Sequence, residues 1–285
     1  MYETVQRVLV TGGSGTLGSQ IVASLKTAGV PVVAPTHQAV DLTDAHAVAA
    51  MVETVAPTQI INCAAQRRPD LCESEDASVI ALNVELPQRL AQMGIPLVHI
   101  STDYVFNGAN APYDEAAPRR PLNAYGRQKA MAEALIEHLS HVLILRVPIL
   151  FGPISNLENS AVTVLAANLI KARGASVWMD DIAVRYPTFT GDVARQLLAL
   201  LPEVGKRYSG IYHYSGAEPM TKFMMGMTMA PLIGCATEQC LPDHRPPMVP
   251  RPYDCHLSTR KLRQTGCFVE PTPFATAILQ TLASR

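Results

Sequence analysis

The feature that most constrains the fold is a glycine-rich stretch, T-G-G-S-G-T-L-G, at residues 11–18. An apolar run at residues 7–11 precedes it and apolar residues at helical spacing follow it, which is typical of strand, turn and helix. Gly12 permits the tight turn, Gly15 lets a pyrophosphate approach the backbone, and Gly18 lets the helix pack on the strand. The free N–H groups at the start of the helix favour a phosphate. The stretch therefore predicts dinucleotide binding rather than an empty structural turn.

Strands and helices are expected to alternate through the first half of the chain. The further predicted strands are apolar throughout and cover residues 30–34, 59–64, 96–102 and 141–147. The predicted helices between them begin after Thr43 and near residues 74 and 125. Apolar strands that alternate with helices predict a parallel sheet covered on both faces. We therefore predict an α/β fold, with a Rossmann-type doubly wound parallel sheet in residues 1–150.

The pattern changes after residue 150. Residues 151–285 are predicted to form a small C-terminal α+β lobe for a substrate or partner, with about 191–215 returning to the main sheet. The proline-rich segment 241–252 is predicted to be an extended loop. Trp178 is interpreted as a packing anchor of the lobe.

Composition excludes several classes of protein. Lys plus Arg number 23 and Asp plus Glu number 24, so the chain lacks the positive excess of nucleic-acid binders. The six cysteines form no C-x-x-C pair, and we predict no metal site. Reduced cysteines in such a chain favour a cytoplasmic protein. The polar start of the chain predicts no signal peptide, and no apolar stretch approaches 18 residues, so no membrane span is expected.

The second strand bears on the choice of cofactor. NAD sites usually carry an acidic residue at its end, which binds the ribose hydroxyls. Here the corresponding residues are A-P-T-H-Q, with neither a carboxylate nor an arginine. Because no carboxylate would repel a 2′-phosphate, we predict NADP(H) rather than NAD(H). Besides the three glycines, the residues assigned to the cofactor site are Ser14, Thr16, Leu17, Thr36, His37, Asp41, Leu42, Cys63, Ala64, Ala65, Asn83, Ser101, Pro148 and Ile149.

The candidate catalytic residues lie at one strand end and on the following helix. Ser101 and Thr102 end the strand 96–102, where parallel sheets bind ligands, and the Thr102 hydroxyl can hydrogen-bond a carbonyl. Tyr125 and Lys129 are four residues apart, on one face of a helix. We predict that Tyr125 is a general acid, and that Lys129 lowers its pKa and binds the nicotinamide ribose. A Tyr-x-x-x-Lys spacing alone is commonly chance, but the glycine turn and Thr102 make chance improbable here.

Several charged residues are candidates for a substrate or anion pocket. They are Arg67, Arg68, Asp103, Arg185 and Arg251. Guanidinium groups suit phosphates because each donates two parallel hydrogen bonds. Solvated surface arginines are the alternative interpretation.

Two polar residues fall inside elements predicted to be buried. Asn83 is interpreted as a buried amide that fixes the neighbouring backbone. His99 is interpreted as a histidine of the core or of the site's surroundings.

At this point the sequence resembles the extended short-chain dehydrogenase/reductase family over almost its whole length. The stretches similar to the branch that contains dTDP-4-dehydrorhamnose reductase are S-T-D-Y-V-F (101–106), P-L-N-A-Y-G-R-Q-K (121–129) and N-C-A-A (62–65). The resemblance implies catalytic roles for Thr102, Tyr125 and Lys129. It also implies reduction of a keto group on a nucleotide-linked deoxysugar.

A closer resemblance is to the regulatory β subunits of methionine adenosyltransferase. It is carried by C-A-A-Q-R-R-P-D (63–70), L-R-V-P-I-L-F-G (145–152), L-E-N-S-A-V-T-V (157–164), R-Y-P-T (185–188) and H-Y-S-G-A-E-P-M-T-K-F (213–223). This resemblance implies an NADP(H)-binding regulatory subunit in S-adenosylmethionine synthesis, with the catalytic subunit as partner. The alternative is dTDP-4-dehydrorhamnose reductase or a related NADPH-dependent nucleotide-sugar reductase. The residues leave open whether the protein is catalytically active.

The resemblance is less informative about assembly. Regulatory subunits of this kind continue past the last helix into a tail that engages the catalytic subunit, whereas this sequence ends at Ser284 and Arg285. The sequence therefore predicts no mode of partner binding. Extended members of the family often form homodimers, and no stretch of this chain tests that.

Overall fold

A six-stranded parallel sheet forms the centre of the computed structural model, which describes residues 7–74, 76–154 and 156–283. The order of its strands is β2-β1-β3-β4-β5-β9. Their bounds are β1 (Val8–Thr11), β2 (Val32–Val33), β3 (Gln59–Asn62), β4 (Leu97–Thr102), β5 (Val142–Val147) and β9 (Gly210–His213). The polar start of the chain, on which the expectation of no signal peptide rested, lies outside the described residues. So do Ser284 and Arg285, on which the expectation about partner binding rested.

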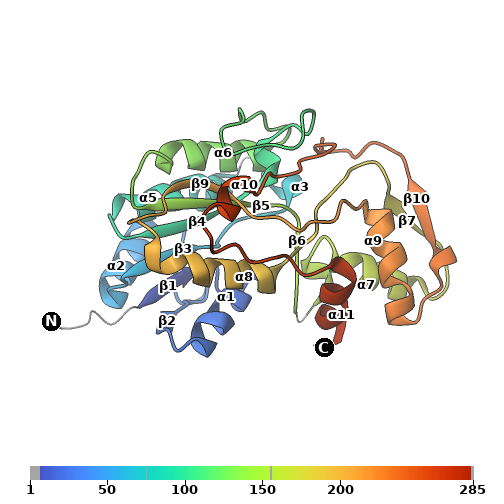
Figure 1. Ribbon diagram of the computed structural model, residues 1–285, viewed down its shortest axis with the longest axis horizontal. Helices are drawn as coiled ribbons and strands as arrows, with labels where there is room; N and C mark the ends of the chain where they lie inside the picture. Colours follow the sequence, from blue (N-terminus) through green and yellow to red (C-terminus); the bar gives the residue numbers. More distant parts are fainter. Residues whose placement is uncertain (1–6, 75, 155, 284–285) are drawn as a thin grey trace.

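Helices cover both faces of this sheet (Figure 1). On one face the strands pack against α1 (Thr16–Thr27) and α8 (Thr190–Leu200). On the other they pack against α2 (Ala45–Val55), α5 (Leu86–Gln92) and α6 (Ala124–Ile136). Strands buried on both sides are apolar throughout, as their sequences are. The prediction of a Rossmann-type doubly wound parallel sheet is confirmed.

The strand order reverses between β1 and β3, and such a switch point is where open α/β sheets bind ligands. The glycine turn leaves β1 at this point. Gly12 has φ +70°, and a Cβ atom there would lie 2.7 Å from the Ala64 backbone nitrogen. A Cβ atom on Gly18 would lie 2.2 Å from the Gly12 carbonyl oxygen. The turn thus has the two close backbone approaches that a pyrophosphate cradle requires.

Replacing Gly12 by alanine tests this close approach. We expect G12A to lower the free energy of unfolding by roughly 2–5 kcal/mol, because strain at positive φ adds to overlap with the β3 backbone. Gly29 is the matched control, since its φ is +73° and a Cβ atom there would have nothing within 4 Å. G29A should cost only about 1–2 kcal/mol. Urea unfolding followed by far-UV circular dichroism measures both, and equal losses would contradict the close-approach argument.

The helix predicted near residues 74–93 is interrupted rather than kinked at Pro87. It consists of α4 (Ala77–Ile80), a π-helical turn (Ala81–Glu85) and α5. Pro87 lies in the first turn of α5, directly after the π-helical turn. The π-helical turn carries Asn83, which is 1% exposed.

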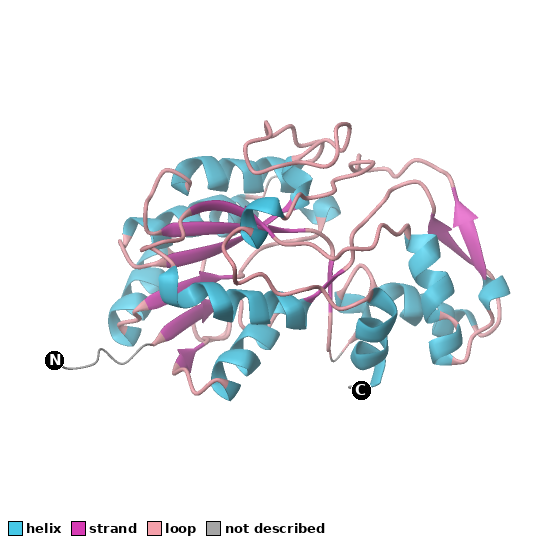
Figure 2. Cartoon of the chain, viewed as in Figure 1, coloured by secondary structure: helices cyan, strands magenta, loops and turns pink. Residues whose placement is uncertain are grey.

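The C-terminal lobe has a separate apolar core beside the end of the sheet (Figure 2). Its helices are α7 (Thr163–Ala172), α9 (Lys222–Met229) and α11 (Phe274–Ala283). Its strands form two parallel pairs, β7 (Val177–Asp180) with β10 (Cys240–Asp243), and β6 (Leu150–Phe151) with β8 (Thr188–Phe189). The remaining short helices are α3 (Pro69–Cys72) and α10 (Arg260–Arg263).

Two expectations about the lobe are wrong. Trp178 is not a packing anchor, because its side chain is 61% exposed on strand β7. The segment 241–252 is not a loop throughout, because its first residues continue β10. Pro242 is tolerated there because β10 is an edge strand of a two-stranded sheet. Among the described residues, no helix has the length and apolar character needed to cross a bilayer.

Candidate active site

The structure brings Thr102 and Tyr125 together at the carboxyl end of β4. Asn123 caps α6 by accepting a hydrogen bond from the Gly126 N–H at 2.9 Å, which fixes where the helix begins. Burial raises the pKa of Tyr125, and a hydrogen bond with Thr102 partly offsets that rise. The phenol therefore keeps its proton at neutral pH. This state suits a general acid that protonates a carbonyl oxygen.

Lys129 is directed toward the sheet. Its side chain is almost fully buried, and its Nζ atom lies 2.9 Å from His99 Nε2 and 2.8 Å from the Ile100 carbonyl oxygen. Burial lowers the pKa of Lys129 to about 8, against an opposing effect of Glu133. The sequence predicted that Lys129 acts on the phenol, whereas its hydrogen bonds here go to β4.

Asp103 and Arg185 lie beside Tyr104, next to the catalytic candidates. Asp103 is 4% exposed, and burial raises its pKa to about 6 although Arg185 opposes the rise. The Arg185 guanidinium lies 5.7 Å from the centre of the Tyr104 ring. Its Nη1 atom donates to two backbone carbonyls, while its buried Nη2 atom has no hydrogen-bond partner among the described residues. An unpaired buried donor of this kind can bind an anionic or carbonyl group of a ligand.

A further cation near Arg185 escaped the sequence analysis. Lys222 begins α9, and burial together with the charges of Arg251 and Arg185 lowers its pKa to about 8. The nearby carboxylates of Asp70 and Asp180 offset part of that positive charge. The signal in the sequence was the lysine in the stretch 213–223, but only tertiary contacts place it beside the two arginines.

The two arginines of the loop after β3 behave differently. The Arg67 guanidinium donates to the Asn159 carbonyl, and its charge interacts with the Tyr125 phenol. Arg68 is exposed, as is Arg67, and has no such contact with the lobe among the described residues. Partial burial lowers the pKa of Arg67, the charge of Arg68 lowers it further, and Tyr125 opposes both effects. Arg251 forms a 3.5 Å ion pair with Asp70 on α3. Contacts from Arg67 and Arg251 therefore bridge this loop to the C-terminal lobe.

Asn83 is a satisfied amide that holds the backbone before Arg67, as predicted. Its Oδ1 atom accepts from the Gln66 N–H at 2.8 Å. Its Nδ2 atom donates to the Gln66 carbonyl at 3.1 Å and to the Gln128 side chain at 2.8 Å. Both N–H groups of this amide and one acceptor position of its oxygen are used within the protein.

The other cofactor candidates divide by position. The residues that follow β1, β3 and β5 in the sheet are Ser14, Thr16, Leu17, Cys63, Ala64, Ala65, Pro148 and Ile149. Thr36 and His37 lie exposed in the loop after β2, and the Asp41 carboxylate accepts from the Thr43 hydroxyl and N–H. Leu42 is partly buried against the apolar core. The Ser101 hydroxyl donates to Glu133 at 2.5 Å, so it is directed away from the switch point.

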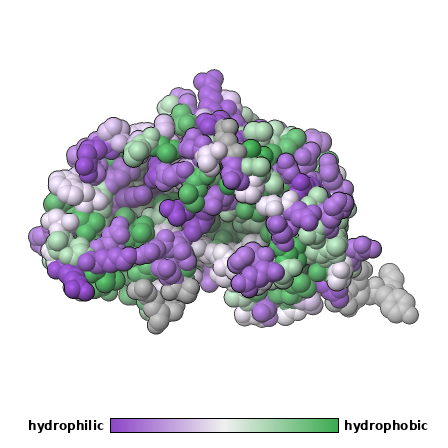
Figure 3. Space-filling view, turned by 180° about the vertical axis from the view of Figure 1, so that it is seen from behind, coloured by the Kyte–Doolittle hydropathy of each residue, from purple (hydrophilic) through white to green (hydrophobic). Residues whose placement is uncertain are grey.

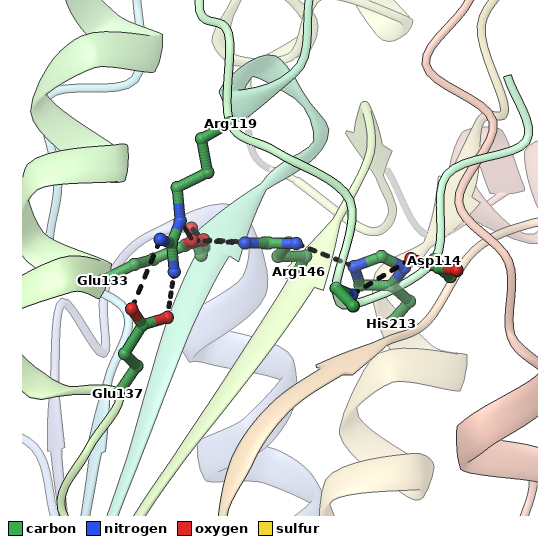
Figure 4. A network of polar contacts seen from close by, with 8 residues as sticks. Asp114, Arg119, Glu133, Glu137, Arg146 and His213 are labelled. Carbon is green, nitrogen blue, oxygen red and sulfur yellow. Dashed lines mark hydrogen bonds and ion pairs between the residues drawn. The ribbon is translucent and has the colours of Figure 1, made fainter. Parts of the chain in front are cut away.

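Glu133 is the centre of a buried ionic network that sequence analysis missed (Figure 4). Its carboxylate is fully buried and accepts from Arg146 Nε at 2.9 Å and from Arg146 Nη2 at 2.6 Å. Arg119 approaches the same carboxylate at 2.6 Å, and also contacts Glu137. The network joins α6 to β5 and thereby fixes the helix that carries Tyr125 and Lys129.

The raised pKa of Asp103 predicts a pH-dependent effect of D103N. The folded protein holds the Asp103 proton more tightly than the unfolded chain does. Ionisation of Asp103 therefore lowers the free energy of unfolding by its full amount above pH 6, and has no effect at a pH well below 4. Asparagine avoids this cost, and D103N should be more stable than the parent by about 3 kcal/mol at most at pH 7. Urea unfolding at pH 7 and at pH 3.5 measures the difference. A difference independent of pH would contradict it.

The surface seen from behind is hollowed between the sheet and the C-terminal lobe (Figure 3). Comparisons with known proteins find relatives that match this chain over almost its whole length. The family model of the RmlD substrate binding domain matches residues 6–285. The crystal structure of a dTDP-4-dehydrorhamnose reductase from Clostridium acetobutylicum superposes with a TM-score of 0.86 at 27% identity, covering 98% of this chain and 99% of that one.

Two relatives of different function are similar in sequence. Methionine adenosyltransferase 2 subunit beta from Danio rerio is 36% identical over 99% of this chain and 92% of its own length. The dTDP-4-keto-6-deoxy-D-glucose reductase from Streptomyces niveus is 34% identical over 80% of this chain and 79% of its own length. The resemblances seen in the motifs are thus confirmed at the level of the whole chain.

Proposed function

The chain belongs to the RmlD substrate binding domain family, and from this premise we propose that it is an NADP(H)-binding regulatory subunit of methionine adenosyltransferase. The observation that carries the proposal is its similarity to the β subunit over 99% of this chain and 92% of that relative. The reductase relative covers a smaller part of the chain. The partner would be the catalytic subunit that makes S-adenosylmethionine.

The contacts across the site support a regulator. The Arg67 contact with Asn159 and the Arg251 ion pair with Asp70 connect the loop beside Tyr125 to the lobe. These contacts hold the loop beside Tyr125 against the lobe. A protein that acts through contact with a partner needs no opening for a bulky substrate.

The test of regulation is direct. The protein is mixed at micromolar concentration with the methionine adenosyltransferase catalytic subunit of the same organism, with and without NADP⁺. Analytical ultracentrifugation follows association, and the rate of S-adenosylmethionine formation follows regulation. We expect a heteromeric species and changed kinetics; two separately sedimenting proteins with unchanged kinetics would overturn the proposal.

The glycine turn fits a pyrophosphate, because alanine-sized side chains at Gly12 or Gly18 would collide with backbone in this cradle. The residues directly after β2, A-P-T-H-Q at 34–38, include no carboxylate that would repel a 2′-phosphate. We therefore expect NADP⁺ to bind more tightly than NAD⁺ in titration calorimetry. Tighter binding of NAD⁺ would contradict the proposed preference.

A second function is favoured by the contact between Thr102 and Tyr125. This function is NADPH-dependent reduction of dTDP-4-dehydrorhamnose or a related nucleotide sugar. Bound NADPH would supply the hydride. Thr102 would orient the substrate carbonyl, Tyr125 would donate its proton to the carbonyl oxygen, and Arg185 and Lys222 would face the anionic part of the substrate. The assay is NADPH oxidation with dTDP-4-dehydrorhamnose, and a rate equal to the substrate-free rate would exclude that substrate.

A further inference from the structure

Three buried polar side chains form a row across the sheet on the side of α6. Thr11, Asn62 and His99 are register partners on β1, β3 and β4, and each is at most 1% exposed. Thr11 donates to Asn62 Oδ1 at 2.7 Å, and Asn62 Nδ2 lies 3.2 Å from His99 Nδ1. His99 Nε2 then lies 2.9 Å from Lys129 Nζ. The row thus connects the glycine-turn strand with the lysine of the site.

The direction of each hydrogen bond follows from one backbone group. The Ala64 N–H donates to Asn62 Oδ1 at 3.1 Å, which fixes the amide oxygen on that side and the amide nitrogen toward His99. An amide nitrogen only donates, so His99 Nδ1 accepts and carries no proton. The proton of the neutral ring is therefore on Nε2 and points toward Lys129. Burial holds the pKa of His99 well below its usual range, and a charge on Lys129 would lower it further, so the ring stays neutral in either state of the lysine.

This arrangement suits only an uncharged lysine. An ammonium group has three donors and no acceptor, so it would oppose the Nε2–H of His99. A neutral amine accepts that proton with its lone pair and still donates to the Ile100 carbonyl at 2.8 Å. The other charged or titratable groups that act on Lys129 are Glu133 on α6 and Cys63 after β3, and burial outweighs them in lowering its pKa to about 8.

We propose that His99 is a positioning residue that docks Lys129 on the sheet as a neutral amine, and that NADP(H) binding releases Lys129 with uptake of one proton. The amine takes the proton from solvent, its hydrogen bond from His99 breaks, and the ammonium binds the nicotinamide ribose. His99 keeps its own proton throughout. This inference deepens the proposed cofactor binding and rests on it. Docking prevails above pH 8, so the affinity for NADP⁺ falls about tenfold between pH 7 and pH 9.

The docked state is tested on the protein without cofactor. Long-range ¹H–¹⁵N spectra at pH 9 report which ring nitrogen of each histidine carries the proton. We expect one signal pair with the proton on Nε2 that is absent from the spectrum of H99F. In N62D the carboxylate accepts from the ring, so the proton should move to Nδ1. A proton on Nδ1 of His99 in the parent would overturn the proposal.

The coupling is tested by calorimetry of NADP⁺ binding at pH 9 in buffers of different ionisation enthalpy. The parent should take up about one proton, whereas N62D should take up almost none because its Lys129 is already charged. The exposed His138, in the turn that follows α6, supplies the control H138Q, which should behave like the parent. Equal uptake in the parent and N62D would overturn the coupling. Absence of NADP⁺ binding at every pH would overturn the proposed cofactor function, and the spectra would still decide whether Lys129 docks on His99.

Discussion

Replacing Glu133 by glutamine lowers the free energy of unfolding by about 3–5 kcal/mol. The side chains of Glu133 and Arg146 are 0% and 1% exposed, and two parallel hydrogen bonds join them. Glutamine keeps the shape of the side chain but removes the charge that compensates Arg146. The neighbouring His213 cannot compensate, because an imidazole never carries a negative charge. Burial and Arg146 lower its pKa to about 3, so it is neutral here. The guanidinium would then be a buried charge without a counter-ion.

The matched control is E137Q on the same helix. Glu137 also pairs with Arg119, but its side chain is 36% exposed, so its loss should cost at most about 1 kcal/mol. Urea unfolding followed by far-UV circular dichroism measures both variants. Burial raises the pKa of Glu133, but hydrogen bonds and the charge of Arg146 outweigh it and hold the pKa below its usual value. The difference between parent and E133Q should therefore shrink as the pH falls below 4.5. Similar losses in E133Q and E137Q would contradict the role of burial.

The second large effect concerns turnover. In the NADPH oxidation assay, Y125F should lower kcat/KM by about 10²–10⁴-fold, because phenylalanine has no proton for the carbonyl oxygen. Burial holds the pKa of Tyr125 above its usual value, so the phenol is protonated across the neutral range. At saturating NADPH, kcat of the parent should therefore show no decrease from ionisation of Tyr125 between pH 7 and pH 9.

The control for this variant is Y104F. The Tyr104 ring lies 6.2 Å from the Tyr125 ring in an edge-to-face contact, and phenylalanine preserves that contact. Y104F should lose less than tenfold in kcat/KM, and both variants should bind NADPH about as tightly as the parent. A loss in Y104F as large as in Y125F would show that packing, not proton donation, explains the effect.

The sequence predicted the sheet, the glycine turn and the helix of Tyr125 because each depends on local patterns. The strands of the sheet are short apolar runs. A strand buried on both faces is apolar throughout, so it can be identified from its own residues alone. The glycines report backbone crowding, which the close approach of Gly12 to Ala64 confirms. Asn83 was predicted correctly because a lone amide within an apolar helix must find partners.

The side-chain network could not be predicted, because its members come from separate elements. Lys222, at the start of α9, lies near Arg251 only because the C-terminal lobe packs their two segments together. Glu133 meets Arg146 across the interface between α6 and β5. Ser101 was predicted to lie at the cofactor site, beside the catalytic candidate Thr102. Successive side chains of a strand point to opposite faces of the sheet, and the Ser101 hydroxyl faces Glu133. Trp178 is exposed because its strand is covered on one side only, which no local pattern reveals.

One consequence of α6 concerns how such proteins change over time. Tyr125, Lys129 and Glu133 follow one another at intervals of four residues, so chemistry and anchorage share a single helical face. A lineage that abandoned turnover would still be selected to keep the helix in place, because losing Glu133 endangers folding. Tyr125 and Lys129 would then be lost slowly, because the helix that carries them is retained for the sake of Glu133. In such a lineage an intact Tyr-x-x-x-Lys pattern indicates descent from an enzyme and is weak evidence of present activity.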